Sequence, residues 1–409
     1  MKESFASQPA ASWMNETLRV LIWARGLRDF GDGFVAVLLP LYLARLGFSP
    51  FEIGVLAGAA LLGSALLTLV IGLIGNRYDA RDLLIVAATL MATTGVALSI
   101  VDSYALLLVV AFIGSVNPSG GSASAFVPIE HAVLTREAAA AARTSAFARY
   151  SLVGGLAAAG GALAVSLPEI LMRMGWPELL GVKAMFAVYA MLGLVGGLLY
   201  VRMTPMPPSL PSSHSRSLGP SRTIVYKLAA LFSLDAFAGG FVVQSLLALW
   251  LFERFDLSLA AAGLFFFWSG ILSAFSYPVA AWLSRRFGLI NTMVFTHIPS
   301  SLCLILAALA PSLPLALSLL LVRAGLSQMD VPTRSSYVMA VVTETERTAA
   351  ASLTSIPRNL AASLSPALAG ALFSFSWAAS PLIICGALKV AYDFLLLNQF
   401  RRLKPPEEC

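Results

Sequence analysis

Long apolar runs, separated by short polar connections, follow one another along almost the whole chain. A helix needs roughly 20 apolar residues to cross the hydrocarbon of a bilayer. The pattern therefore predicts an all-α membrane protein with twelve transmembrane helices in two six-helix halves. The predicted spans lie near residues 20–46, 51–75, 82–101, 104–128, 144–168, 179–202, 225–253, 258–283, 289–309, 313–342, 349–374 and 378–400.

Composition supports lipid as the solvent of these runs. Of the 409 residues, 58% are hydrophobic and 12% are charged, which is about half the charged share of a soluble domain. The cysteines Cys303, Cys385 and Cys409 are scattered and follow neither a metal-site spacing nor a disulfide framework. We find no nucleotide-binding loop and no paired metal-ligand motif. We therefore expect no enzyme activity, no cofactor, and no catalytic or metal-binding residues.

Lysine and arginine residues are concentrated in alternate connections. With a cytoplasmic N-terminus, 16 of the 27 basic residues lie in inner segments and four in outer segments. This asymmetry is typical of membrane topology, so the net charge of +6 does not indicate a nucleic-acid partner. We expect both termini in the cytoplasm and a monomeric, multi-pass protein of a bacterial inner (plasma) membrane.

A polar connection rich in proline and serine divides the chain in two. It predicts an N-terminal six-helix bundle over 1–202, a cytoplasmic linker over 203–224 and a C-terminal six-helix bundle over 225–409. Parallel six-span repeats with the site between the halves describe one transporter architecture. Matching residues recur at an offset of 209 in Ser49 and Ser258, Gly54 and Gly263, and Arg77 and Arg286, and at 204 in Pro128 and Pro332 and in Arg143 and Arg347.

The loop "GLIGNRYDARD" (72–82) after the second span resembles a loop of the major facilitator superfamily. The family pattern reads Gly-x-Leu-x-Asp-Arg-x-Gly-Arg-Arg/Lys, and Gly72 and Arg77 match it. Asn76 stands where the family has Asp, and Asp79 stands at the second Gly. The resemblance covers nearly the whole chain, and it implies pseudo-symmetric six-helix halves that move a solute by alternating access. It also implies that this loop helps to lock the inner side.

Four charged residues, Arg25, Arg28, Asp29 and Asp32, enter the first span. At about 1.5 Å per residue, Asp32 lies near the bilayer midplane and Asp29 about one turn nearer the cytoplasm. One interpretation is a polar stripe in a central cavity, with Asp32 as proton carrier or substrate ligand. The other is two intrahelical ion pairs, Arg25 with Asp29 and Arg28 with Asp32, whose arginine heads reach the cytoplasmic interface.

The remaining polar residues within the spans fall into two groups. Asp235 in span 7 either carries protons or binds a cation, or it makes a satisfied contact between helices. The arginines of spans 5, 10 and 11 either hold an anionic group or pair with the buried acids. The cavity candidates are Asp29, Asp32, Asn117, Arg149, Asp235, Arg323 and Arg358, and the candidates for a cytoplasmic gate or lock are Arg77, Asp79, Arg286, Asp330, Arg334 and Arg347.

Some polar residues are expected to be structural. Asn117 is also compatible with a packing seam between helices, because small and hydroxyl residues surround it. Pro118, with Gly120 and Gly121, is expected to bend this span. Lys389 and Asp393 stand four residues apart in span 12, which predicts a self-neutralised pair on a supporting helix. His297 in span 9 is expected to be simply hydrogen-bonded.

The sequence favours a secondary transporter of a small, charged or zwitterionic solute. Buried acids make protons the leading coupling ion, and export is expected ahead of import. An alternative is a gradient-driven uniporter or importer of an organic anion, whose buried charges only hold helices together. A third hypothesis, from another class, is a membrane sensor that binds a ligand without transporting it.

Overall fold

The computed structural model describes residues 15–119, 124, 126–138, 143–206, 219–343, 346–374, 378–401 and 403. Throughout these residues the regular structure is helical. The first half contains α1 (Glu16–Arg45), α2 (Pro50–Ile74), α3 (Ala80–Ile100), α4 (Tyr104–Ile113), α5 (Phe126–Glu137), α6 (Arg143–Leu163), α7 (Leu167–Arg173) and α8 (Glu178–Val201). The second contains α9 (Arg222–Gly240), α10 (Gln244–Phe255), α11 (Leu259–Phe287), α12 (Leu289–Ala308), α13 (Leu313–Ser327), α14 (Asp330–Val341), α15 (Arg347–Phe373) and α16 (Ser380–Phe400).

Nine helical stretches of the described residues are long and apolar enough to cross a membrane. Helices α1 and α15, with 30 and 27 residues, are also long enough to do so. The pair α4 and α5 covers the remaining predicted span. The chain is therefore a multi-pass integral membrane protein, and its helices are consistent with the twelve predicted spans.

Three predicted spans are broken in the middle. α4 ends at Ile113 and residues 114–119 are not helical, α9 and α10 are interrupted between Gly240 and Gln244, and α13 and α14 are separated by two residues. The first break contains Pro118, where the sequence predicts a bend. Proline has no backbone N–H to donate to the preceding turn, so the helical hydrogen bonds are interrupted there. Broken helices place free backbone groups in the protein interior, which a membrane tolerates only where protein or water can satisfy them.

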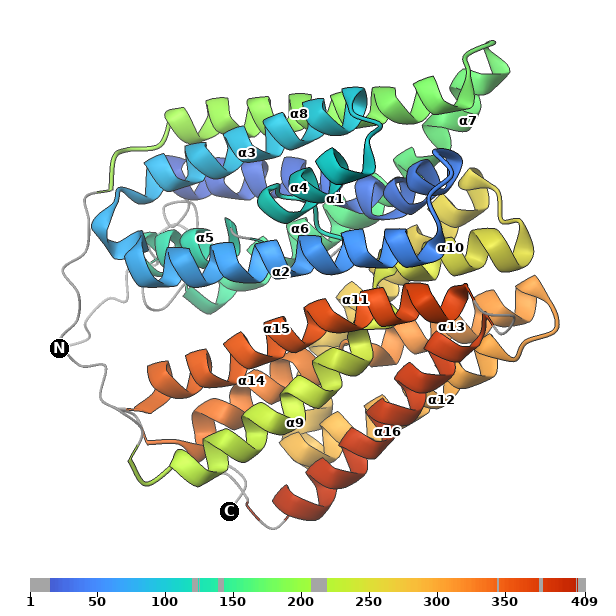
Figure 1. The fold of residues 1–409 in the computed structure, drawn as a ribbon. Coiled ribbons are helices and arrows are strands. Elements are labelled where there is room, and N and C mark those ends of the chain that lie inside the picture. The colour runs from blue at the N-terminus through green and yellow to red at the C-terminus, as the bar shows by residue number, and fades with distance from the viewer. Residues whose placement is uncertain are drawn as a thin grey trace, which may run out of the picture.

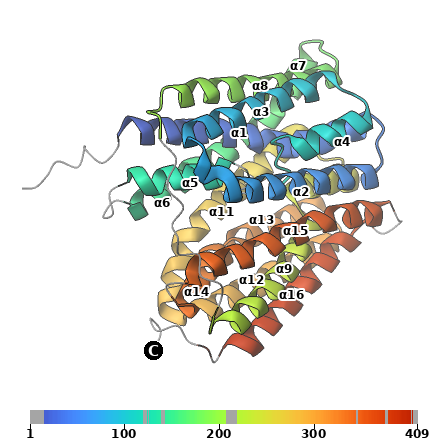
Figure 2. The same cartoon turned by 60° about the vertical axis from the view of Figure 1, so that its left-hand side comes forward.

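The helices form two groups. In Figure 1, α1 to α8 lie in the upper part of the view, and α9 and α11 to α16 lie in the lower part. Figure 2 shows the same separation after a turn of 60°. Helix α10 crosses toward the first group and packs against α1. The proposed division at 203–224 stays a prediction, because residues 207–218 lie outside the described part of the chain.

The two groups meet closely at the end of the molecule opposite to N and C in Figure 1. There α2 packs against α15 and α6 against α11. A Cβ atom added at Gly54 would overlap the backbone oxygen of Pro366, so this approach requires glycine. The backbone N–H of Ser245 donates to the carbonyl oxygen of Pro118 across the two groups, with 3.0 Å between N and O. This end, predicted to face outward, is closed by backbone contact.

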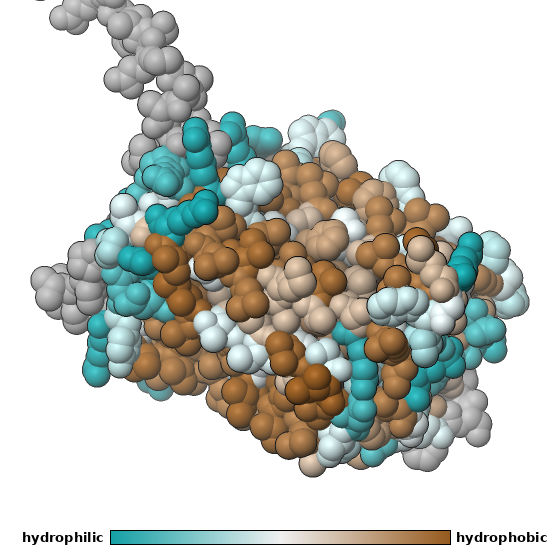
Figure 3. Space-filling view, turned by 90° about the horizontal axis from the view of Figure 1, so that it is seen from above, coloured by the Kyte–Doolittle hydropathy of each residue, from teal (hydrophilic) through white to brown (hydrophobic). Residues whose placement is uncertain are grey.

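The exterior is apolar where lipid would surround it. Figure 3 shows hydrophobic residues over the middle of one face and hydrophilic residues mainly toward its ends. Large apolar side chains of α3 and α8 are exposed, among them Val86 (65%) and Leu198 (67%). Such a large apolar surface would be unstable in water and is suited to a bilayer.

Candidate functional site

Glu130 is the centre of a buried cluster in the first half. Its side chain, on α5, has no exposed surface. Tyr200 on α8 donates a hydrogen bond to Glu130 Oε1 at 2.8 Å, and Tyr150 on α6 donates to Oε2. Arg28 Nη1 lies 2.9 Å from Oε1 and Arg25 Nη1 lies 3.9 Å from Oε2. Side chains of three helices, α1, α6 and α8, thus converge on one carboxylate of α5.

The two arginines of α1 also share Asp29. Arg25 Nε lies 2.6 Å from Asp29 Oδ2, and Arg28 Nε lies 3.4 Å from Asp29 Oδ1. Both guanidinium groups lie over aromatic rings, Arg25 over Tyr150 and Arg28 over Phe126. Two cations and two carboxylates therefore balance inside the bundle, which is the arrangement that makes buried charge tolerable.

Asp32 takes no part in these ion pairs. It is 4% exposed and accepts a hydrogen bond from the Tyr189 hydroxyl at 3.1 Å. The Tyr189 hydroxyl also lies 3.2 Å from Ser115 Oγ, which belongs to the break between α4 and α5. No cationic atom of the described residues lies within 4.0 Å of Asp32. The predicted pair of Arg28 with Asp32 is therefore not formed, since Arg28 instead contacts Asp29 and Glu130.

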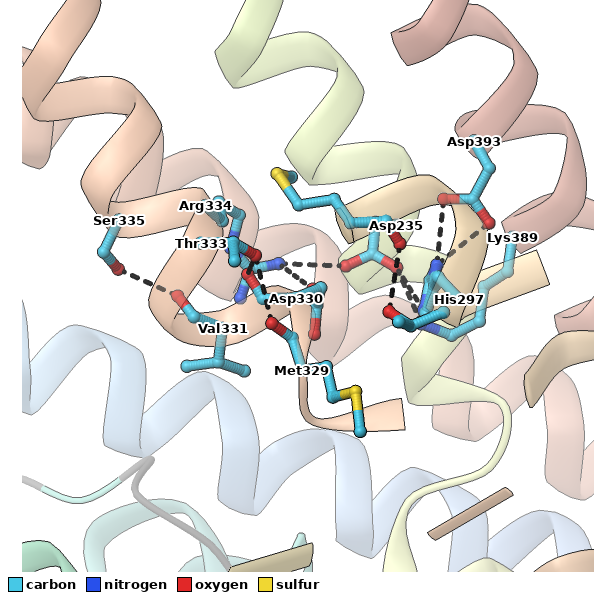
Figure 4. A network of polar contacts seen from close by, with 12 residues as sticks. Asp235, His297, Met329, Asp330, Val331, Thr333, Arg334, Ser335, Lys389 and Asp393 are labelled. Carbon is cyan, nitrogen blue, oxygen red and sulfur yellow. Dashed lines mark hydrogen bonds and ion pairs between the residues drawn. The ribbon is translucent and has the colours of Figure 1, made fainter. Parts of the chain in front are cut away.

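The second half contains a longer chain of polar contacts, shown in Figure 4. Asp235 on α9 is 3% exposed and lies at its centre. Its Oδ2 accepts from Arg334 Nη1 at 3.2 Å, and Arg334 Nη1 also lies 3.0 Å from Asp330 Oδ2 on α14. Its Oδ1 lies 2.6 Å from Lys389 Nζ on α16. One carboxylate thus connects three helices through two cations.

The chain continues from Lys389 to α12. Lys389 Nζ lies 3.2 Å from His297 Nε2, and His297 Nδ1 lies 3.0 and 3.1 Å from the two carboxylate oxygens of Asp393. The predicted pair of Lys389 with Asp393 is therefore wrong, because each residue has a different partner. Spacing along one helix indicated that the two could meet, whereas packing of α9 and α12 against α16 offered both better partners.

The two clusters occupy equivalent places in the two halves, with opposite polarity. Asp235 stands 207 residues after Arg28, and Arg334 stands 204 residues after Glu130. The first half pairs a cation on α1 with an acid on α5, and the second pairs an acid on α9 with a cation on α14. Close backbone approaches recur at the same offsets: Gly33 against the oxygen of Ala158, and Gly240 against the oxygen of Ala362. This repetition supports an origin of the halves by duplication.

The other cavity candidates lie in different surroundings. Asn117 is buried in the break after α4, and its Oδ1 accepts from the backbone N–H of Ser119. Arg149 is exposed. Arg323 lies on α13, and no carboxylate oxygen of the described residues lies within 4.0 Å of it.

Arg358 on α15 lies close to the Asp235 cluster. Arg334, Asp235 and Asp330 are the charged groups in its neighbourhood. Its Nε is buried without a hydrogen-bond partner among the described residues. No carboxylate oxygen of those residues lies within 4.0 Å of it. Arg358 is thus a cation without a carboxylate of its own.

The predicted gate residues do not form one group in the described structure. Asp330 and Arg334 are buried in the Asp235 cluster. Asp79 caps α3, where its side chain accepts from the Arg81 backbone N–H. The three remaining arginines are exposed: Arg77 at the end of α2, Arg286 beside Trp282 and Phe287, and Arg347, whose Nε donates to the Met339 carbonyl.

Sequence reasoning missed the central position of Glu130 and the participation of His297. Glu130 falls between the predicted spans 104–128 and 144–168, and His297 was expected to be a simply hydrogen-bonded residue of span 9. The signal for Glu130 was present, because the offset of 204 that relates Pro128 to Pro332 also relates Glu130 to Arg334. Nothing in the sequence indicated that α12 turns His297 toward α9 and α16.

Comparison with known proteins gives a consistent picture. The family model of the Major Facilitator Superfamily matches residues 21–246 and 228–408. An uncharacterized membrane protein of Saccharomyces cerevisiae, YJR124C, is 23% identical over 417 residues and covers 93% of each chain. A variant of the nucleoside transporter NupG superposes with a TM-score of 0.76 at 15% identity, covering 94% of this chain and 100% of that one. A D-xylose-proton symporter gives 0.76 at 16%, covering 97% and 99%.

Proposed function

This chain belongs to the Major Facilitator Superfamily, and we propose that it couples proton movement to transport of a small charged or zwitterionic solute. Membrane transport by alternating access is the activity of the family fold. We propose export as the direction of transport. We also propose that the protein lies in a bacterial inner membrane with both termini on the cytoplasmic side, and the distribution of basic residues predicts this orientation. A D-xylose-proton symporter among the similar structures fits proton coupling on this fold.

The observation that carries the proposal is the environment of Asp32. This carboxyl group is buried, and among the described residues its one hydrogen-bond partner is the hydroxyl of Tyr189. An ionised carboxylate in an apolar interior is costly unless a cation or several donors compensate it. A proton bound to Asp32 removes that charge, so the same residue can carry a proton between the two sides when the helices rearrange.

Arg358 supports a solute with an anionic group. A guanidinium keeps its charge in proteins and binds carboxylate or phosphate through paired N–H donors. Arg358 has a buried Nε without a partner in the described structure and lies beside a second arginine. A solute carboxylate or phosphate would supply the missing acceptor, whereas a neutral sugar would leave the charge of Arg358 without an anionic partner.

Reconstituted protein tests the proposal. Proteoliposomes are given a pH gradient, and uptake of radiolabelled L-glutamate, succinate, uridine and D-xylose is compared in wild type and Asp32→Asn. We expect gradient-driven accumulation of an anionic or zwitterionic probe by wild type. Asp32→Asn is expected to retain exchange of that probe across the membrane but to lose gradient-driven accumulation.

Two outcomes would contradict this function. Flux that is unchanged when a protonophore dissipates the gradient favours the uniporter, in which the buried charges only join helices. Binding of a probe without any flux favours the sensor. Lys183→Met is a suitable control, because Lys183 makes an exposed contact with Asp102 far from either cluster.

A further inference from the structure

His297 sits inside a continuous chain of hydrogen bonds that joins α16, α12, α9 and α14 (Figure 4). The imidazole is 2% exposed. Its Nδ1 faces both oxygens of Asp393 at 3.0 and 3.1 Å, and its Nε2 faces Lys389 Nζ at 3.2 Å. Both ring nitrogens therefore have a polar partner, and the partners differ in kind: one is an acceptor and the other a donor.

The partners determine which nitrogen carries the hydrogen. A lysine ammonium group has donors and no acceptor, so Nε2 must accept from Lys389. A carboxylate accepts, so the hydrogen is on Nδ1 and is donated to Asp393. His297 is thus the neutral Nδ1–H tautomer, with the lone pair of Nε2 directed at a cation. Lys389 at the same time donates to Asp235 Oδ1 at 2.6 Å.

We propose that Nε2 of His297 is a proton-binding site that decides whether Lys389 or His297 is the partner of Asp235. The incoming proton forms an N–H bond with the Nε2 lone pair, and the O–H bond of the hydronium ion that delivers it breaks, leaving water. The resulting imidazolium carries N–H groups on both nitrogens, so Nε2 can no longer accept from Lys389. Two cations then face each other where one hydrogen bond existed, and Asp393 stabilises the imidazolium from the other side.

The geometry gives the protonated histidine a new acceptor. Asp235 Oδ1 lies 3.8 Å from His297 Nε2, so a small rotation brings the new N–H to the oxygen that Lys389 now occupies. Release of Lys389 would remove the ion pair between α16 and α9. Arg334 would then share Asp235 with the imidazolium. The inference rests on the proposed proton coupling, because it places a second proton site in the half that lacks Asp32.

The charges around His297 define how it responds to pH. The side chains in direct contact with His297 are Asp393 and Lys389. The ring of Tyr392 lies nearly perpendicular to the imidazole, with 6.0 Å between the ring centroids. On the far side of Asp235, Arg334 Nη1 contacts both Asp235 and Asp330. The titratable and charged groups on the helices packed against α12 and on α9 are Cys385, Lys389, Tyr392 and Asp393 on α16, Arg222, Tyr226, Lys227 and Asp235 on α9, Asp330, Arg334 and Tyr337 on α14, Arg323 on α13, and Tyr277, Arg285 and Arg286 on α11.

Nitrogen NMR of the full-length protein in lipid nanodiscs tests the site directly. The chain has three histidines, His131, His214 and His297, so histidine labelled with ¹⁵N gives few signals and His297→Gln assigns one set. We expect the Nδ1–H tautomer at high pH and protonation of both nitrogens as the pH falls.

Two variants should move the titration in opposite directions. Lys389→Met removes the adjacent cation, so the midpoint of the His297 titration should rise by about 1 to 3 pH units. Asp393→Asn removes the adjacent anion, so the midpoint should fall. Lys183→Met, which removes a lysine from the other half, should leave it unchanged. A residue that only fills space would not give opposite shifts.

An Nε2–H tautomer at high pH, a His297 signal that does not titrate, or midpoints that ignore both substitutions would overturn the proposal. If Lys389→Met does not fold, the Asp393→Asn shift alone decides between these results. The outcomes are separable from the proposed function. Proton-driven flux with a His297 that does not titrate removes this site but leaves coupling through Asp32, whereas a titrating His297 without proton-driven flux contradicts the coupling.

Discussion

Substitution of Glu130 by glutamine should destabilise the protein far more than loss of an exposed ion pair. The change keeps the shape of the side chain and removes its charge. In wild type this carboxylate faces Arg28 at 2.9 Å and Arg25 at 3.9 Å, and it accepts hydrogen bonds from Tyr150 and Tyr200. After the substitution, Asp29 is the one carboxylate left for two buried guanidinium groups.

The structure sets the size of the effect. With an effective dielectric constant of about 20, two unit charges 2.9 Å apart attract by about 6 kcal/mol before desolvation is considered. Removing one partner of a buried pair costs about 3–5 kcal/mol in practice. The matched control is Glu178→Gln, because Glu178 pairs with Arg45 at 3.0 Å in an exposed position. Such pairs contribute about 0–1 kcal/mol.

Unfolding of the purified variants in mixed micelles with increasing denaturing detergent measures both costs. We expect Glu130→Gln to lower the free energy of unfolding by several kcal/mol and Glu178→Gln to leave it nearly unchanged. Adding Arg28→Met to Glu130→Gln should recover part of the loss, since it removes the uncompensated cation. Equal costs for the two glutamine variants, or no recovery in the double variant, would refute the account of the cluster as a set of mutually compensated charges.

Two further predictions concern the exterior and the closed end. The hydrogen bond from Lys183, followed by that from Tyr42, lowers the pKa of Asp102, which lies in the connection between α3 and α4. The contribution of ionised Asp102 to stability is therefore present above the ordinary aspartate pKa of about 3.9. It is lost as the pH falls through the lower pKa that Asp102 has in the folded protein. Melting temperatures of wild type and Lys183→Met should accordingly differ slightly near neutral pH and converge in acid; a difference that grows in acid would contradict this sign. Gly54→Val should separate α2 from α15, because its side chain would overlap the backbone of α15, and spin-label distances across that end should lengthen; unchanged distances would argue against closure by backbone contact.

Much of the fold could be predicted because each span carries its own signal. Apolar runs of sufficient length located the helices, and the linker and the repeated offsets indicated two halves. The break at Pro118 was also visible, because glycine and proline concentrate there. The breaks at Gly240 and Met329 were not predicted, although Gly239 stands beside Gly240 and Gln328 and Asp330 flank Met329. Membrane helices tolerate such residues, so the interruption depends on contacts with other helices.

The candidate site was harder to predict, because ion pairing depends on tertiary packing. The spacing of four residues correctly indicated the contact of Arg25 with Asp29, and it failed for Lys389 with Asp393. In each case the outcome depended on which other charges the neighbouring helices present. Asp32 and Asp235 are both buried in the protein interior, but their contacts come from within their own halves.

A pH-jump measurement on reconstituted protein tests proton carriage by Asp32 most directly, because it needs no solute. Proteoliposomes are adsorbed on a solid-supported membrane, and the charge displaced by a sudden change of external pH is recorded for wild type, Asp32→Asn and Lys183→Met. We predict a transient displacement in wild type and in Lys183→Met that is lost in Asp32→Asn. An undiminished displacement in folded Asp32→Asn would contradict the assignment of this buried carboxyl group as the proton carrier.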